Sequence, residues 1–203
     1  MRITAIKAQV KNVERVSIYL DGVYAFSLTQ NQLLELKLHS GKELNDAEVA
    51  ELKQASDYGK LLERVMNFIM IRPRSVREVH DYLWRKKAEP DTAARIIQRL
   101  KDRGYLNDTT FAASWVRARQ LTKPVSKRRL QAELMQKGVA HDVIEQALGD
   151  DQYDETSALH EIVAKKRRQA RYQDEQKLMQ YLARQGFGYD QIKKALHETN
   201  GQI

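Results

Sequence analysis

The feature that most constrains the fold of this chain is an internal repeat. The segments LMQKGVAHDVIEQAL (134–148) and LARQGFGYDQIKKAL (182–196) carry leucine, glycine, aspartate, isoleucine and alanine at matching positions, each pair 48 residues apart. An earlier Ile-x3-Leu pair, Ile96 and Leu100, precedes the next one by the same 48 residues. Self-similarity at such a period is typical of repeat proteins, in which each unit buries its apolar face against its neighbours. The sequence therefore predicts tandem copies of one small unit.

The first half of the earliest copy follows the same pattern at a different offset. SVREVHDYLWRKKAEPD matches SKRRLQAELMQKGVAHD, with Ser75 over Ser126 and an offset of 51 residues. The change from 51 to 48 places three extra residues between Lys87 and Asp91.

Each copy is predicted to form three helices. The first is long and covers about 57–71, 108–121 and 154–172. The second is short and ends at Lys87, Gly138 or Gly186, where glycine suits the left-handed residue that follows a helix. The third carries the Ile-x3-Leu pair, whose members share one helix face. We expect a mainly α fold, an elongated and curved array of three tandem three-helix repeats, preceded by a small N-terminal β-hairpin or three-stranded segment.

The N-terminal part has a different pattern. Residues 14–28 alternate between apolar and polar around Asp21-Gly22, a dipeptide that favours a two-residue hairpin turn. Residues 2–10 are expected to add a third strand, because a lone hairpin is marginal in water. Helix caps are expected at Thr29 and at Asn45, the latter in a capping box with Glu48. The expected domains are 1–56 (β-rich extension with short helices), 57–107, 108–152 and 153–203 (one repeat each).

The stretch RGYLNDTTFA (103–112) is predicted to join the first two repeats. Gly104 ends one helix, and Asn107 or Asp108 caps the next. If Asn107 is the cap, Leu106 and Phe111 form a hydrophobic staple across it. Arg103 is the member of this stretch that we expect to be available for a direct contact.

Composition narrows the class of protein. The chain has 203 residues, a net charge of +8 and no cysteine, so disulfides, thiolate metal sites and a cysteine nucleophile are excluded. No apolar run approaches the roughly 18–20 residues that a membrane helix needs, and no signal peptide is evident. A cytoplasmic protein is expected. The net charge is −1 for residues 1–57, +5 for 58–108, +3 for 109–150 and +1 for 151–203, and excess positive charge favours polyanionic partners.

With the repeat established, the chain resembles the RecX family of bacterial recombination regulators. The resemblance covers about residues 57–198 and rests on short motifs in a characteristic order: RPRSVREVHDYL (72–83), RGYLNDTTFA, LQAELMQKGV (130–139) and YLARQGFGYDQIKKAL (181–196). It implies tandem three-helix repeats, no catalysis, and binding to filaments of the recombinase RecA, whose ATPase, strand exchange and coprotease activities family members restrain. Many members also bind DNA.

Basic clusters are the candidate contact residues for a RecA filament or for DNA. They are Arg72, Arg74 and Arg77; Arg85, Lys86 and Lys87; Arg117, Arg119, Lys123, Lys127, Arg128 and Arg129; and Lys165, Lys166, Arg167 and Arg168, followed by Arg171. The first and third clusters surround Pro73 and Pro124 at equivalent junctions. There, basic side chains and the amide groups of the next helix are expected to converge on a phosphate. The alternative is that such charge runs are solvated helix faces.

Other chemistry has weaker support in the sequence. Trp84, Trp115, Tyr82 and Tyr105 offer rings for base stacking, although aromatic residues at helical spacing are more often core. The five histidines show no metal-ligand spacing, and we find no phosphate loop, nucleophile elbow or paired carboxylates. We therefore expect neither an enzyme nor a cofactor.

The functional prediction is a regulator of homologous recombination and the SOS response. It binds RecA filaments on single-stranded DNA, and duplex DNA more weakly, as a monomer and without a membrane. One alternative is a stand-alone DNA-binding regulator of the helix-turn-helix type, although no helix concentrates the residues of base readout. The other is a protein-interaction array with little salt dependence.

Overall fold

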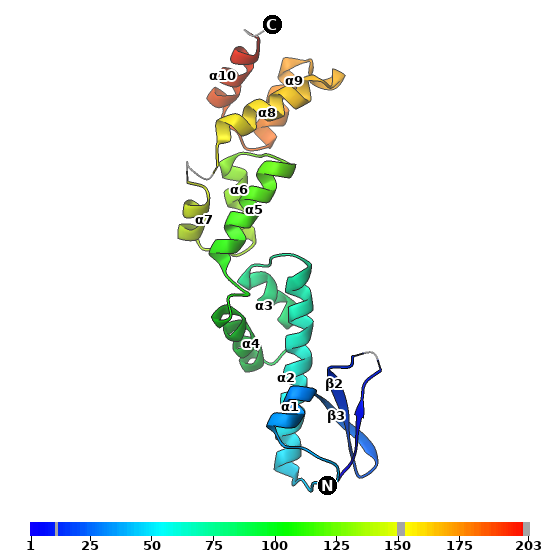
Figure 1. Cartoon of the computed structure of the whole chain (residues 1–203). Coiled ribbons are helices and arrows are strands. Elements are labelled where there is room, and N and C mark those ends of the chain that lie inside the picture. The colour runs from blue at the N-terminus through cyan, green and yellow to red at the C-terminus, as the bar shows by residue number, and fades with distance from the viewer. Residues whose placement is uncertain (11, 150–152, 201–203) are drawn as a thin grey trace. The chain divides into compact units, whose positions relative to one another are not determined.

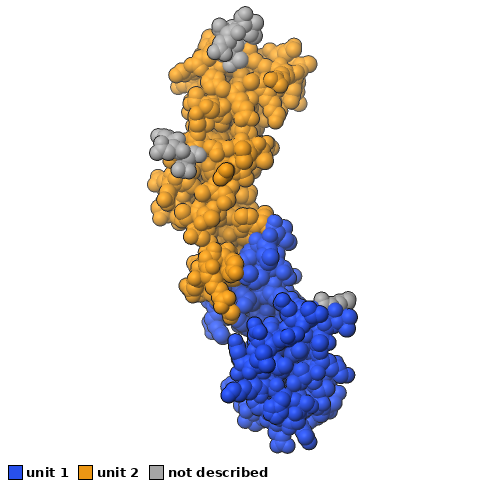
Figure 2. Space-filling view, in the orientation of Figure 1, with its two compact units in different colours: residues 1–71, 83–96 blue, residues 72–82, 97–203 orange. Residues whose placement is uncertain are grey.

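The computed structural model describes residues 1–10, 12–149 and 153–200. The elements, in chain order, are β1 (Ile3–Ala8), β2 (Arg15–Leu20), β3 (Val23–Thr29), α1 (Gln30–Glu35), α2 (Asp46–Ile71), α3 (Val76–Arg85), α4 (Pro90–Asp102), α5 (Asp108–Thr122), α6 (Lys127–Gln136), α7 (His141–Ala147), α8 (Glu155–Arg167), the 3-10 turn η1 (Ala170–Tyr172), α9 (Glu175–Arg184) and α10 (Tyr189–Asn200) (Figure 1). The predicted class, mainly α with three tandem three-helix repeats after a three-stranded segment, is confirmed. The chain divides into two compact units, residues 1–71 with 83–96 and residues 72–82 with 97–203 (Figure 2).

The predicted three-stranded N-terminal segment forms an antiparallel sheet with the order β1-β2-β3. Asp21 and Gly22 both have positive φ angles, 47° and 86°, which a type I′ hairpin turn requires. The inward side chains, including Ile18 and Phe26, are almost completely buried. Helix α2 packs against β3 and covers this face (Figure 1).

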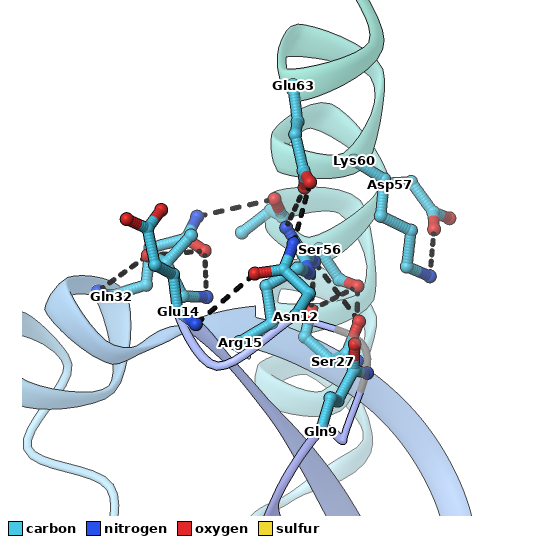
Figure 3. Close-up of polar contacts among 12 residues, drawn as sticks. Gln9, Asn12, Glu14, Arg15, Ser27, Gln32, Ser56, Asp57, Lys60 and Glu63 are labelled. Carbon is cyan, nitrogen blue, oxygen red and sulfur yellow. Dashed lines mark hydrogen bonds and ion pairs between the residues drawn. The ribbon is translucent and has the colours of Figure 1, made fainter.

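A buried polar network ties the sheet to helix α2 (Figure 3). Arg15 is only 4% exposed, and its Nη2 donates to the carbonyl oxygen of Ser27 at 2.9 Å while its Nη1 lies 3.4 Å from a carboxylate oxygen of Glu63. The Ser56 hydroxyl donates to the same Ser27 carbonyl at 2.7 Å. A buried guanidinium is tolerated only when it is paired and hydrogen-bonded, so these contacts specify where the sheet sits on α2.

Helix α2 is longer than the sequence pattern indicated. The first helix of the first repeat was expected to begin near residue 57, but α2 begins at Asp46 and runs without a break to Ile71. The capping box predicted at its start is present, with the amide of Glu48 bound to Asn45 and the amide of Asn45 bound to Glu48. One helix therefore serves both the sheet and the first repeat: it contains no proline, and Gly59 within it does not adopt the positive φ of a cap.

The second and third repeats each enclose a separate core. Phe111, Val116, Leu130 and Ile144 are among the buried residues of the second. The third core includes Leu159, Val163, Leu178, Leu182 and Ile192. The single helix expected over 154–172 is wrong only in its last five residues, because α8 ends at Arg167 and a 3-10 turn follows.

The stretch 103–112 forms the predicted junction. Gly104 has a φ of +73°, and the Asn107 side chain accepts hydrogen bonds from the amides of Thr109 and Thr110. Leu106 and Phe111 on either side of this cap are 3% and 4% exposed, as a hydrophobic staple requires.

In the described part of the chain, none of the helices is both long and apolar enough to span a bilayer.

Candidate functional site

The two proline junctions are the places where consecutive repeats meet within the second unit. At the first, the Ser75 hydroxyl donates to the carbonyl oxygen of Lys137 at 2.7 Å. The amide of Val76, the first residue of α3, donates to the Asp108 carboxylate at 2.9 Å. The N-terminus of α3 is thus seated on the C-terminal end of α6.

The second junction repeats these contacts. The Ser126 hydroxyl donates to the carbonyl oxygen of Gln185 at 3.0 Å, and the amide of Lys127 donates to the Glu155 carboxylate at 2.8 Å. The N-terminus of α6 is therefore seated on the C-terminal end of α9. Because these two amides already have acceptors, any phosphate contact at the junctions depends on side chains, which differs from the expected convergence of amides on a phosphate.

At the first junction, Glu78 joins basic residues from two repeats. Arg72 donates both of its terminal nitrogens to the Glu78 carboxylate, at 2.8 and 3.0 Å, and Lys137 Nζ lies 2.7 Å from it. Burial by itself would raise the pKa of Glu78, but the hydrogen bonds and charges of Arg72 and Lys137 outweigh burial and lower this pKa to about 2. Partial burial and the charge of Arg72 lower the pKa of Arg74. Arg72 is therefore engaged in an ion pair at the junction between two repeats.

Within the second repeat, Glu133 on α6 joins side chains of α5 and α6. Arg119 donates to both Glu133 oxygens, at 2.9 and 2.8 Å, and the Trp115 indole donates to one of them at 3.0 Å. Arg129 lies 3.7 Å from the same carboxylate and donates to the side chain of Gln185 at 3.0 Å. Two of the predicted contact residues, Arg119 and Arg129, are thus engaged inside the protein.

The other predicted contact residues differ in how exposed their side chains are. The exposed ones are Arg77, Arg85, Lys86, Lys87, Arg117, Lys123, Arg128, Lys165, Arg168 and Arg171, while Arg74, Lys127, Lys166 and Arg167 are half-buried. Lys166 Nζ lies 4.7 Å and 5.2 Å from the ring centres of Tyr181 and Tyr172, so its charge is partly used in cation–π contacts. The structure brings together the residues at each junction and leaves Lys165–Arg168 as a separate group at the end of α8.

The four aromatic candidates divide into two kinds. Trp115 packs against the core of the second repeat, with Arg119 and Lys137 over its ring, and is therefore not a free stacking surface. Tyr82 is half-buried. Trp84 and Tyr105 are 75% and 55% exposed and remain candidates for stacking.

Sequence reasoning missed the two carboxylates that bind these basic side chains, and two further residues that contact the carboxylates or their partners. Glu78, Glu133, Lys137 and Gln185 were not singled out, because each meets its partners across a turn or from another repeat. Glu78 did carry a local signal, since Ser75-x-x-Glu78 is a capping-box sequence. Within the described residues, no group of three or more acidic or histidine side chains is arranged to hold a metal ion.

We expect the first junction to weaken at acidic pH through Glu78. Its pKa in the folded protein, about 2, lies below its ordinary value of 4.5. Its stabilising contribution is therefore complete above about pH 4.5 and is lost as the pH falls toward 2. Glu78→Gln should lower the free energy of unfolding near neutral pH by about 1–3 kcal/mol, because charged hydrogen bonds are lost. Urea unfolding of both proteins at pH 6.5 and pH 3 measures this, and an equal gap at the two pH values would contradict it.

Fold and site together define a class of protein: tandem three-helix repeats that are joined by polar contacts and carry exposed basic side chains. Comparison with known proteins assigns this class to a family. Four family models match: the regulatory protein RecX N-terminal domain (residues 1–45) and the first (62–100), second (107–148) and third (153–196) RecX three-helix domains.

Whole-chain relatives agree with these matches. Regulatory protein RecX of Bacillus subtilis (strain 168) is 33% identical over 201 residues, which covers 97% of this chain and 76% of the relative. The protein of the same name from Bacillus pumilus is 36% identical and covers 97% and 77%. A crystal structure of regulatory protein RecX superposes with a TM-score of 0.72 and 25% identity over 97% of this chain and 98% of that one. The crystal structure of RecX from Lactobacillus salivarius gives a TM-score of 0.60 over 72% of this chain. The chain belongs to the RecX family of regulatory proteins.

Proposed function

We propose that this protein is a non-enzymatic regulator of homologous recombination and the SOS response. It binds RecA filaments on single-stranded DNA and inhibits their ATPase, growth, strand exchange and coprotease activity. It acts in the cytoplasm as a monomer and needs no cofactor. Membership of the RecX family supports the regulatory role.

One structural observation favours a filament as the partner. Arg77 and Arg128 occupy the same position, the second residue of α3 and of α6, and both are exposed. The third repeat has Gln176 at this position. Equivalent cations on successive repeats suit a partner that presents the same acidic feature repeatedly, as a nucleoprotein filament does, and several weak contacts then gain avidity.

Other basic side chains of the second unit would add to the contact surface that Arg77 and Arg128 form. Lys123 and Arg117 are exposed at the C-terminal end of α5, and Arg74 lies between α2 and α3. A basic face of the repeat array is expected to lie along the filament groove and bridge successive RecA subunits. Bridging restrains the motions that ATP turnover requires, because the bound protein favours one filament state.

A RecA ATPase assay on single-stranded DNA tests the proposal. Sub-stoichiometric protein is expected to lower the ATPase rate and to shorten the filaments seen by electron microscopy. An unchanged ATPase rate together with unchanged filament length would contradict the proposal. A mobility shift on duplex and single-stranded DNA, with and without RecA, tests the alternative of a stand-alone helix-turn-helix-like regulator, which predicts sequence-selective duplex binding without RecA.

A further inference from the structure

Each repeat-to-repeat junction in the second unit consists of a seated helix end and a receiving socket. The socket of the second repeat comprises the Asp108 carboxylate, the Lys137 carbonyl and the left-handed Gly138, and it holds the N-terminus of α3. The socket of the third repeat comprises the equivalent residues Glu155, Gln185 and Gly186, and it holds the N-terminus of α6.

The first repeat carries the same three positions in the first unit. Subtracting 51 residues from Asp108, Lys137 and Gly138 gives Asp57, Lys86 and Lys87, and the same offset relates the buried Val116 to Val65. Lys87 has a φ of +56°, the left-handed conformation that Gly138 and Gly186 adopt.

The backbone at the end of α3 also matches. The amide of Lys87 donates to the carbonyl oxygen of Trp84 at 2.8 Å, and the amide of Ala88 donates to that of Leu83 at 3.1 Å. At the end of α6 the corresponding bonds, from Gly138 and Val139 to Met135 and Leu134, are 2.9 and 3.1 Å long. The first repeat therefore retains the backbone frame of a socket.

Where the other two sockets hold a helix, this one faces a cavity. Asp57, Lys86 and Lys87 all line a cavity of about 1050 Å³, together with residues of α2 and the start of α4. The Asp57 side chain is 76% exposed, and its ion pair with Lys60, at 3.1 Å, is a surface pair of the kind that contributes little.

We propose that this cavity is a docking site for the N-terminal end of an α-helix from a partner protein. The partner helix has serine or threonine at its cap, a small residue at its second position and glutamate at its third. This inference does not depend on the proposed role in recombination, because it follows from the repeat geometry alone.

Each preference has a counterpart in the occupied sockets. The cap hydroxyl corresponds to that of Ser75, which donates to the carbonyl of Lys137; the Ser126 socket is not the precedent, because a Cβ at Gly186 would collide with the Ser126 hydroxyl. The glutamate corresponds to Glu78, the third residue of α3, which pairs with Lys137, and Lys86 is the equivalent of Lys137. Asp57 would accept the first free amide of the partner helix, as Asp108 does from Val76.

The small second residue follows from Lys87. A Cβ atom at Gly138 would lie 2.4 Å from Cδ and 2.6 Å from Cβ of Arg77, the second residue of the helix seated there. Lys87 has a Cβ atom at this place, so any second residue on the incoming helix that carries a Cβ atom would collide with it, and the small residue is glycine. The first socket therefore excludes helix ends that resemble those of α3.

A second copy of this chain fits this socket poorly. The equivalent helix end in the third repeat, that of α9, begins with Asp174 and Glu175 and has Lys177 as its third residue. Asp174 has no hydroxyl proton to donate, the acidic pair would face Asp57, and Lys177 would face Lys86. Like charges at both contacts disfavour head-to-tail association, so the occupant is a different protein.

Labelled stapled-helix peptides and the full chain test this proposal by fluorescence anisotropy. A peptide whose helix begins Ser-Val-Gly-Glu is expected to bind at least about tenfold more tightly than one that begins Ser-Val-Gly-Lys. Lys86→Glu should reverse this preference, and Asp57→Ala should weaken binding of the first peptide about tenfold. Lys101→Glu, at the exposed C-terminal end of α4 and outside the cavity, is the matched control and should change nothing.

A third peptide beginning Ser-Val-Arg-Glu, the sequence of residues 75–78, separates the socket from simple charge attraction. It should bind Lys87→Gly at least about tenfold more tightly than the unaltered protein, because the colliding Cβ is removed. Equal binding of the glutamate and lysine peptides, or no binding at millimolar peptide, overturns the proposal. Concentration-dependent dimerisation that Asp57→Ala abolishes would assign the socket to a second copy and also overturn it.

Discussion

Gly186→Ala is expected to lower the free energy of unfolding by about 2–5 kcal/mol. Gly186 has a φ of +95°, where an L side chain costs about 1–2 kcal/mol, and a Cβ there would lie 2.3 Å from the Ser126 hydroxyl oxygen. That hydroxyl is buried and bonded to Gln185, so it cannot move without breaking the junction. Overpacking of this kind adds about 1–3 kcal/mol. Urea unfolding followed by circular dichroism measures the total.

Gly104→Ala provides the matched control for this prediction. Gly104 has a similar φ of +73°, but a Cβ there would meet nothing within 4 Å. It should therefore show the conformational cost alone, about 1–2 kcal/mol. Hydrogen exchange should locate the extra loss in Gly186→Ala at the N-terminus of α6 and the C-terminus of α9. Equal destabilisation by the two variants would show that the junction does not depend on this close approach.

Reversing Arg77 and Arg128 together is expected to weaken binding to a RecA filament about 100-fold or more at moderate salt. Both side chains are exposed at the same position of successive repeats, and placing a carboxylate beside an anion costs more than removing a cation. The slope of log affinity against log salt concentration should fall by about two, one for each cation. Anisotropy titrations of labelled filaments at several salt concentrations provide the measurement.

Lys53→Glu with Lys101→Glu is the matched control, because it changes the net charge equally at two exposed sites outside the predicted clusters. Arg72 is unsuitable for this test, although the sequence placed it in the same cluster. Its reversal would set a carboxylate beside Glu78 and break the junction itself. Filament affinity that stays within about threefold in Arg77→Glu/Arg128→Glu would remove both residues from the contact surface.

The same network explains why a charge run is an ambiguous signal. Arg72, Arg119 and Arg129 were grouped with Arg77 and Arg128 because they are close in the sequence. In the structure Arg72 meets Glu78 at the first junction, whereas Arg119 and Arg129 meet Glu133 within the second repeat. Only the path of the backbone decides which cation reaches an internal carboxylate, and that path is not encoded in local composition.

Features that arise from local and periodic chemistry could be predicted from the sequence alone. The Asp21-Gly22 turn, the Asn107 cap and the left-handed glycines each depend on neighbouring backbone, and the spacing of Ile144 and Ile192 reports one repeated helix face. The extent of α2 depended on the tertiary structure, because the polar contacts of Arg15 and Ser56 hold one unbroken helix against the sheet.

How the repeats are joined, and which socket holds no helix, depended on the tertiary structure. The partners in each socket are about 60 residues apart along the chain, as Ser75 and Lys137 are, and no local pattern pairs them. The pairing arises because the N-terminus of one helix needs acceptors and the C-terminus of another needs donors, a demand that buried backbone groups always make. In the second and third repeats, a glycine lies where the N-terminus of another helix docks. In the first repeat Lys87 occupies this position, beside a cavity that the described residues leave open.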